Sequence, residues 1–63
     1  MNGQQATLLV QALAVTAEIE GMVAANQVEV QDGRLPHYVE GHFTEKAEEL
    51  YSISQHIILA GKE

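Results

Sequence analysis

The chain has 63 residues and no cysteine, and its nine acidic residues against three basic ones give a formal net charge of −6. It is therefore one small domain without disulfides or thiolate metal ligands, and its three scattered cations argue against direct binding of nucleic acid through phosphates. Hydrophobic residues make up 46% of the chain, too high a share for a solvated disordered segment.

The first predicted element is a helix over about residues 5–31, with apolar residues on two of its sides. Asn2 and Gly3 are candidate caps, and the opening residues are expected to be frayed. The first apolar stripe repeats at spacings of three and four and comprises Leu8, Ala12, Val15, Ile19 and Met22 or Val23. The second stripe comprises Ala6, Val10, Leu13, Ala17, Ala24 and Val28. Because one neighbour covers only one side of a helix, this helix needs two sets of neighbours.

Two residues of this helix are open to more than one interpretation. Gly21 costs about 1 kcal/mol relative to alanine in a helix interior, so it indicates close approach of another backbone or a bend, unless it is simply tolerated on an exposed face. Asn26 lies on the first stripe, where a polar residue can fix the register and oligomeric state of a helical assembly. An exposed helix end explains Asn26 equally well.

A connection over residues 32–39 and a second helix over about residues 40–60 complete the chain. The pairs Asp32-Gly33 and Leu35-Pro36 are typical of a helix end followed by a break, and Gly61 is a stop signal for the second helix. The second helix is expected to bury one broad side, formed by Phe43, Ala47, Leu50, Tyr51, Ile53, Ser54, Ile57 and Ile58.

These patterns predict an all-α fold, a single domain over residues 1–63 made of an antiparallel two-helix hairpin. Ordering the chain costs on the order of 1.5 kcal/mol per residue, and one seam between two helices is not expected to offset that cost. We therefore expect two copies to form a homodimeric four-helix bundle with the first helix at its centre. The residues expected at the oligomer interface are Leu8, Val10, Leu13, Val15, Ala17, Ile19 and Met22.

The longest apolar stretch runs from Ala6 to Ala17, is interrupted by polar residues, and is shorter than the ~20 residues of a membrane span. It also lacks the basic flank and cleavage pattern of a signal peptide. The sequence therefore predicts a buried helix of a soluble, cytoplasmic protein that does not enter a membrane.

Residues that carry chemistry are few and poorly spaced. His37 and His42 each precede a glutamate by three residues, but no Glu-x-x-His or His-x-x-x-His spacing occurs, so we predict no metal site. Ser54 and His56 point to different faces of the second helix, and the glycines form no phosphate-binding loop. We expect no cofactor and no enzymatic activity.

Two aromatic residues, Tyr38 and Phe43, lie beside the chain reversal. They are expected to cap the end of the bundle, or else to present an anchor to a partner, since tyrosine is common among binding hot spots. Tyr51 is expected in the core. Acidic residues offer a second partner surface, so the candidate partner-binding residues are Tyr38, Glu45, Glu48 and Glu49.

The run Gly21-Met22, Asn26, Pro36, Tyr38 and Phe43 resembles a pattern in small uncharacterised helical proteins of tailed phages and marine viral sequences. The likeness covers about residues 13–51. It implies a small phage-encoded protein located in the host cytoplasm, without an assigned activity, and it transfers no catalytic residue. Gly41, in what would be the first turn of the second helix, departs from this pattern and puts the start of that helix in doubt.

The function predicted from the sequence is a non-enzymatic, acidic, oligomeric interaction or accessory module. The alternative is an acidic inhibitor or nucleic-acid mimic that occupies a basic groove of a host protein. A third interpretation is a metal or small-ligand site within the bundle.

Overall fold

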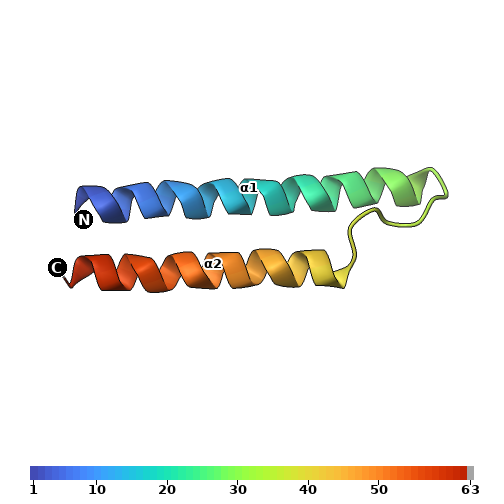
Figure 1. Ribbon diagram of the computed structural model, residues 1–63. Helices are drawn as coiled ribbons and strands as arrows, with labels where there is room; N and C mark the ends of the chain where they lie inside the picture. The colour runs from blue at the N-terminus through green and yellow to red at the C-terminus, as the bar shows by residue number, and fades with distance from the viewer. Residues whose placement is uncertain (63) are drawn as a thin grey trace.

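The computed structural model describes residues 1–62 and contains two helices, α1 (Gly3–Gln31) and α2 (Glu40–Gly61). They lie side by side and run in opposite directions, with both chain termini at one end and the connection over residues 32–39 at the other (Figure 1). No strand occurs within the described residues. The prediction of an all-α helical hairpin is confirmed.

The helix α1 begins at Gly3, two residues before the predicted start, and Asn2 is its N-cap. The Asn2 side chain accepts a hydrogen bond from the Gln5 backbone N–H at 2.8 Å, and the Gln5 side chain accepts one from the Asn2 N–H at 3.1 Å. This reciprocal pair is a capping box. Asn2 Nδ2 also donates to the carbonyl of Ala60 on α2 at 3.0 Å. The expectation of frayed opening residues is wrong at Asn2, because two sets of hydrogen bonds hold it.

The end of α1 uses glycine as the sequence indicates. Gly33 has φ +78°, a left-handed conformation that costs an L side chain energy but not glycine. Its N–H donates to the Val30 carbonyl at 3.0 Å, and the Arg34 N–H donates to the Glu29 carbonyl at 2.8 Å. These two bonds form a Schellman motif, which satisfies carbonyls that the helix end would otherwise leave unpaired.

At the start of α2, the first-turn glycine does not delay the helix. Glu40 is the first helical residue, and its carboxylate suits the positive end of the helix dipole. The Val39 N–H donates to Nδ1 of His42 at 3.1 Å, so a histidine side chain satisfies one of the backbone donors at this end.

The two helices meet along one narrow seam with a heptad-like repeat. On α2, every buried or half-buried residue follows alternating spacings of three and four. On α1, every buried or half-buried residue except Ala25 does the same. Val15, Met22 and Ala60 are buried, and the other seam residues are half-buried. The seam comprises Gln5, Leu8, Ala12, Val15, Ile19, Met22, Asn26 and Glu29 of α1 with Phe43, Lys46, Leu50, Ile53, Ile57 and Ala60 of α2.

The apolar side of α2 is wider than this seam, which corrects the prediction of one broad buried face. Tyr51 is 68% exposed and Ile58 is 53% exposed, so neither belongs to the core of the hairpin. Ala47 and Ser54 are exposed as well. A single partner helix covers only the two innermost positions of each heptad, and residues that flank them stay in solvent.

The hairpin is long and thin, with Cα extents of 51 × 17 × 8 Å. Its Cα radius of gyration is 15.1 Å, whereas a compact domain of this length has about 11 Å. Its accessible surface is 4671 Å², compared with about 4000 Å² for a folded monomer of the same mass. One hairpin therefore encloses an unusually small core for its length.

Candidate interaction surfaces

The side of α1 that faces away from α2 forms a continuous row of exposed, mostly apolar residues without charge. We call this surface the outer face and define it by exposed residues at spacings of three and four: Gly3, Thr7, Val10, Ala14, Ala17, Gly21, Ala24 and Val28. Val10 is 64% exposed and Val28 is 52% exposed, and Leu13 at its edge is 61% exposed. No residue of the outer face is charged. Contiguous exposed apolar surface of this kind is typical of interaction sites.

The seven residues predicted at the oligomer interface divide between the two sides of α1. Leu8, Val15, Ile19 and Met22 lie on the seam, where α2 of the same chain covers them, so the hairpin itself accounts for their apolar character. Val10 and Ala17 belong to the outer face, and Leu13 lies beside it. Only the last three are available to a second molecule.

Gly21 belongs to the outer face, between Ala17 and Ala24. A Cβ atom added to Gly21 would have no atom within 4 Å, apart from its chain neighbours and the nearby backbone of its own helix. The hairpin alone therefore gives no packing reason for glycine at this position.

By length and composition, α1 could also cross a membrane. It has 29 residues and contains an 18-residue window of mean hydropathy 1.5, of which only 11% is buried in the hairpin. The expectation of a buried helix is therefore not met within a single chain. Glu18 and Glu20 lie near the middle of α1, and an acidic residue at the centre of a membrane helix costs roughly 3 kcal/mol.

Charge is distributed unevenly along the hairpin. Residues 3–17 of α1 and 51–61 of α2 contain no Asp, Glu, Lys or Arg, and they lie together at the end with the termini. We call this end the uncharged half. Residues 18–49 contain eight acidic residues, Arg34 and Lys46, which is the whole net charge of −6, and we call them the acidic half. Lys62 and Glu63 cancel in formal charge.

The acidic half contains the ion pairs found among the described residues. Lys46 Nζ on α2 lies 2.6 Å from Glu18 Oε2 on α1 and 3.4 Å from Glu49 Oε2. Hydrogen bonding to Glu18, more than to Glu49, raises the pKa of Lys46 above its ordinary value. Lys46 thus occupies a seam position with its charge compensated across the two helices.

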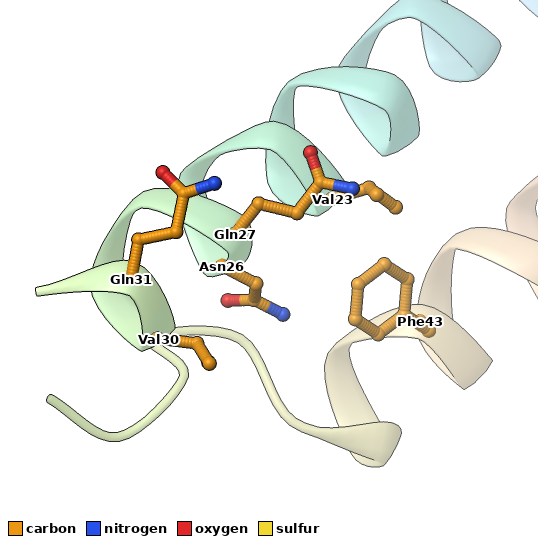
Figure 2. Close-up of a pocket in the computed structure, with 6 residues that line it drawn as sticks. All are labelled: Val23, Asn26, Gln27, Val30, Gln31 and Phe43. Atoms are coloured by element: carbon orange, nitrogen blue, oxygen red, sulfur yellow. The ribbon is translucent and has the colours of Figure 1, made fainter. Parts of the chain in front are cut away.

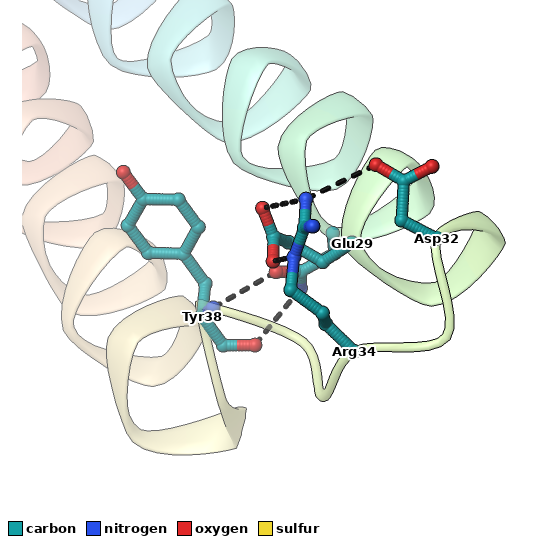
Figure 3. Close-up of polar contacts among 5 residues, drawn as sticks. Glu29, Asp32, Arg34 and Tyr38 are labelled. Carbon is teal, nitrogen blue, oxygen red and sulfur yellow. Dashed lines mark hydrogen bonds and ion pairs between the residues drawn. The ribbon is translucent and has the colours of Figure 1, made fainter.

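Asn26 is a seam residue near the loop end of α1. Its Nδ2 donates to the Tyr38 carbonyl at 2.8 Å, and its Oδ1 accepts from the Tyr38 N–H at 2.8 Å. Nearby, Arg34 pairs with Glu29 in the last turn of α1 and with Asp32, the first residue of the connection (Figure 3). Asn26 is therefore neither a loose helix end nor, in the hairpin, a contact between copies: it ties the connection to α1.

Tyr38 is half-buried and packed between two histidines. Its ring meets His37 edge-on at a centroid distance of 4.8 Å and His42 edge-on at 5.6 Å. This arrangement fits the capping interpretation of Tyr38, since its backbone and ring both have partners within the chain. Glu45, Glu48 and Glu49, the other candidate partner residues, are exposed.

Beside this end lies a hollow of about 500 Å³. The ring of Phe43 on α2 faces residues of α1 across it (Figure 2). It is lined by Val23, Asn26, Gln27, Val30, Gln31 and Phe43. The lining contains amides and apolar groups but no charged or nucleophilic side chain, so it offers shape for a small apolar group and no evident chemistry.

Groups that could support catalysis have other partners. The Ser54 hydroxyl donates to the Tyr51 carbonyl at 2.7 Å, and Nδ1 of His56 lies 2.7 Å from the Ser52 carbonyl. Within residues 1–62, no three or more His, Cys, Asp or Glu side chains gather to hold a metal ion. The geometry thus offers no activated nucleophile among these groups and no ready metal centre.

Sequence reasoning missed the contacts that close the terminal end. Gln5 Nε2 donates to the Ile57 carbonyl at 3.2 Å, and Asn2 bonds to Ala60 as described above. One signal was present in the sequence: Gln5 carries an amide at the first position of the seam repeat. Asn26 carries an amide at the equivalent position three heptads later.

Together these features define a small all-α hairpin with a thin core, an uncharged outer face and an acidic half. No protein-family model, curated protein or solved structure matches the chain. The resemblance to small phage proteins therefore stays a prediction.

Proposed function

We propose that this protein is a non-enzymatic interaction module that works as a self-associated helical bundle, in which two hairpins pack through the outer face of α1. The observation that carries this proposal is the exposure of that face and its edge: Val10 on the face and Leu13 at the edge are each more than 60% exposed. Packing a second hairpin there adds a second layer to a hairpin that buries three of its described residues.

Charge favours this face over the others as the site of contact. The outer face has no charged residue, whereas α2 exposes several glutamates on its own far side, among them Glu45 and Glu48. Pairing through α1 brings together apolar groups and leaves the carboxylates in water, where they need no partner. The two central glutamates of α1 favour an aqueous assembly over insertion in a membrane, and we retain the cytoplasm as the proposed location.

The test is sedimentation equilibrium from low to high micromolar concentration, with helicity followed by circular dichroism on the same samples. We expect a mass of two chains and helicity that persists on dilution. Leu13→Glu should yield monomers, because it places a carboxylate against the outer face. Gln55→Glu adds the same charge to the exposed side of α2 and is the matched control, which should remain dimeric.

Two results would contradict the proposal. The first is a helical monomer at high micromolar concentration. The second is loss of the dimer in Gln55→Glu together with its retention in Leu13→Glu, which would move the interface to α2. Co-sedimentation of the wild-type chain with neutral lipid vesicles would instead favour the membrane alternative.

A second candidate function, an acidic inhibitor that mimics nucleic acid, is favoured by one observation: the entire net charge of −6 lies in residues 18–49. Such a surface would occupy a basic groove and speed its encounter with the target. Inhibition of a panel of nucleases that is relieved by salt and competed by DNA would support it. Replacing Glu45, Glu48 and Glu49 by glutamine should then weaken inhibition, and unchanged inhibition would count against this role.

A further inference from the structure

The uneven charge along the rod bears on how two copies would pair. We propose that the two α1 helices pack antiparallel through their outer faces, with Val10 of each copy opposite the partner's Gly21. This inference rests on the proposed function, since it assigns an orientation and register to the same interface.

Repulsion between the acidic halves selects the antiparallel orientation. In a parallel pair the two acidic halves lie side by side, which brings two net charges of −6 to one end of the assembly. In an antiparallel pair each acidic half lies beside the partner's uncharged half. The α1 parts of the two acidic halves, residues 18–31 of each copy, are then centred about 27 Å apart along the axis at a rise of 1.5 Å per residue, beyond the ~8 Å screening length at physiological salt. Opposed helix dipoles add to the same preference.

Side-chain size selects the register. The outer-face residues alternate between heptad positions a and d, with each d three residues after an a. In an antiparallel pair of helices, an a residue of one helix lies opposite a d residue of the other. With Val10 opposite the partner's Gly21, no layer joins two bulky residues and all but the central one join a larger residue to a smaller one. The remaining layers are Ala14 with the partner's Ala17, Thr7 with the partner's Ala24, and Gly3 with the partner's Val28.

Registers one heptad away pack less evenly. Shifting one way places Gly3 opposite the partner's Gly21 and leaves space between the helices. Shifting the other way places Val10 opposite the partner's Val28, with a thin layer of Ala17 and the partner's Gly21 nearby. The proposed register also explains why Gly21 is glycine although nothing in its own chain crowds it.

Distances between spin labels at two single sites test the orientation. The chain has no cysteine, so Gln4→Cys and Gln11→Cys each give one label per copy, at equivalent exposed positions of α1. In the proposed dimer the labels are separated along the axis by about 35 Å at position 4 and about 14 Å at position 11, from a rise of 1.5 Å per residue. Each labelled variant is first checked for the wild-type mass.

The outcomes separate this inference from the proposed function. Equal distances at the two sites show a parallel dimer and overturn the inference while the proposed function stands. Axial distances shifted together by about 10 Å place the pair one heptad away and overturn the register. A labelled chain that is monomeric like the wild type overturns the proposed function and this inference with it.

A substitution tests the contact at Gly21 without labels. Gly21→Leu should weaken dimerisation at least tenfold, because the added side chain meets the partner's Val10. Gly41→Leu is the matched control: a Cβ there also has no atom within 4 Å, and Gly41 lies on the exposed side of α2. Gly41→Leu should leave the dissociation constant of the dimer within twofold of the wild-type value. Equal constants for the two variants would overturn the assigned contact.

Discussion

The uncharged half and the acidic half of the hairpin are closed by the same device but held along their length by different forces. At both ends an amide side chain at an equivalent seam position of α1 hydrogen-bonds to backbone outside α1: Gln5 to the Ile57 carbonyl of α2, and Asn26 to the N–H and carbonyl of Tyr38 in the connection. Between those ends, the acidic half adds ion pairs centred on Lys46, whereas the uncharged half has only apolar contacts. The end that carries the repulsive charge is thus also the end with compensating cations.

The largest expected effect breaks the uncharged half. Val15 is 4% exposed in the seam, and no cation lies within this half to pair with a new carboxylate. Val15→Asp should destabilise the hairpin by several kcal/mol and unfold it, because a buried unpaired charge is among the costliest changes in a protein. Thermal and urea unfolding followed by circular dichroism measure the loss.

Val10→Asp is the control for this substitution, since it adds the same charge to the outer face of the same half. We expect it to weaken self-association while the hairpin keeps more helicity than Val15→Asp. A Val15→Asp variant with the wild-type thermal midpoint would show that the seam lies elsewhere.

The next effect opens the loop end of the acidic half. Asn26→Ala removes both hydrogen bonds to Tyr38 and leaves part-buried backbone groups without partners. The expected loss is about 1–3 kcal/mol, measured by urea unfolding, together with faster hydrogen exchange of the Tyr38 amide. Gln27 is the next residue and is exposed, so Gln27→Ala is the control and should change neither the free energy of unfolding nor the exchange rate of the Tyr38 amide appreciably. Unchanged exchange at Tyr38 in Asn26→Ala would mean that other contacts hold the connection.

A smaller effect tests the closure of the uncharged half. A Cβ on Gly61 would lie 2.5 Å from Gln5 Nε2, so Gly61→Ala should displace the amide from the Ile57 carbonyl. Losing that bond costs about 1 kcal/mol, while alanine recovers a similar amount of helix propensity. We therefore expect Gly61→Ala to be near neutral in the wild type but stabilising in a Gln5→Ala background. Equal effects in both backgrounds would show that the two residues are not coupled.

Local sequence patterns predict the features of this hairpin that depend on neighbours in the chain, but not those that depend on packing between helices. The helix type, the connection and the left-handed Gly33 follow from periodicity and turn chemistry, which depend on neighbours in the chain. The exposure of Tyr51 could not be predicted from these patterns, because it depends on how much of α2 one partner helix covers. The assembly predicted from the two stripes lies beyond a single chain and stays a prediction.

The candidate surfaces divide in the same way. The two apolar sides of α1 were visible in the spacing, but residues such as Val15 could not be assigned to the seam rather than to an oligomer interface without knowing where α2 packs. The amide contacts of Asn2, Gln5 and Asn26 join residues 12 to 58 positions apart, and no local pattern indicates such partners. Charge segregation, by contrast, needs only a count along the chain, and its importance emerges once the hairpin places residues 3–17 beside 51–61.

The smallest effect concerns the exposed surface of the acidic half. Glu48 is exposed on α2 and belongs to none of the ion pairs of Lys46, so Glu48→Gln should change the free energy of unfolding by less than about 0.5 kcal/mol. Any change should be stabilising, because the substitution removes one of the charges that repel within this half, and raising the salt concentration should reduce it. Urea unfolding at low and high salt measures both. A destabilisation above 1 kcal/mol would mean that this carboxylate contacts another molecule, and the acidic half rather than the outer face of α1 would then be the place to look for the second copy.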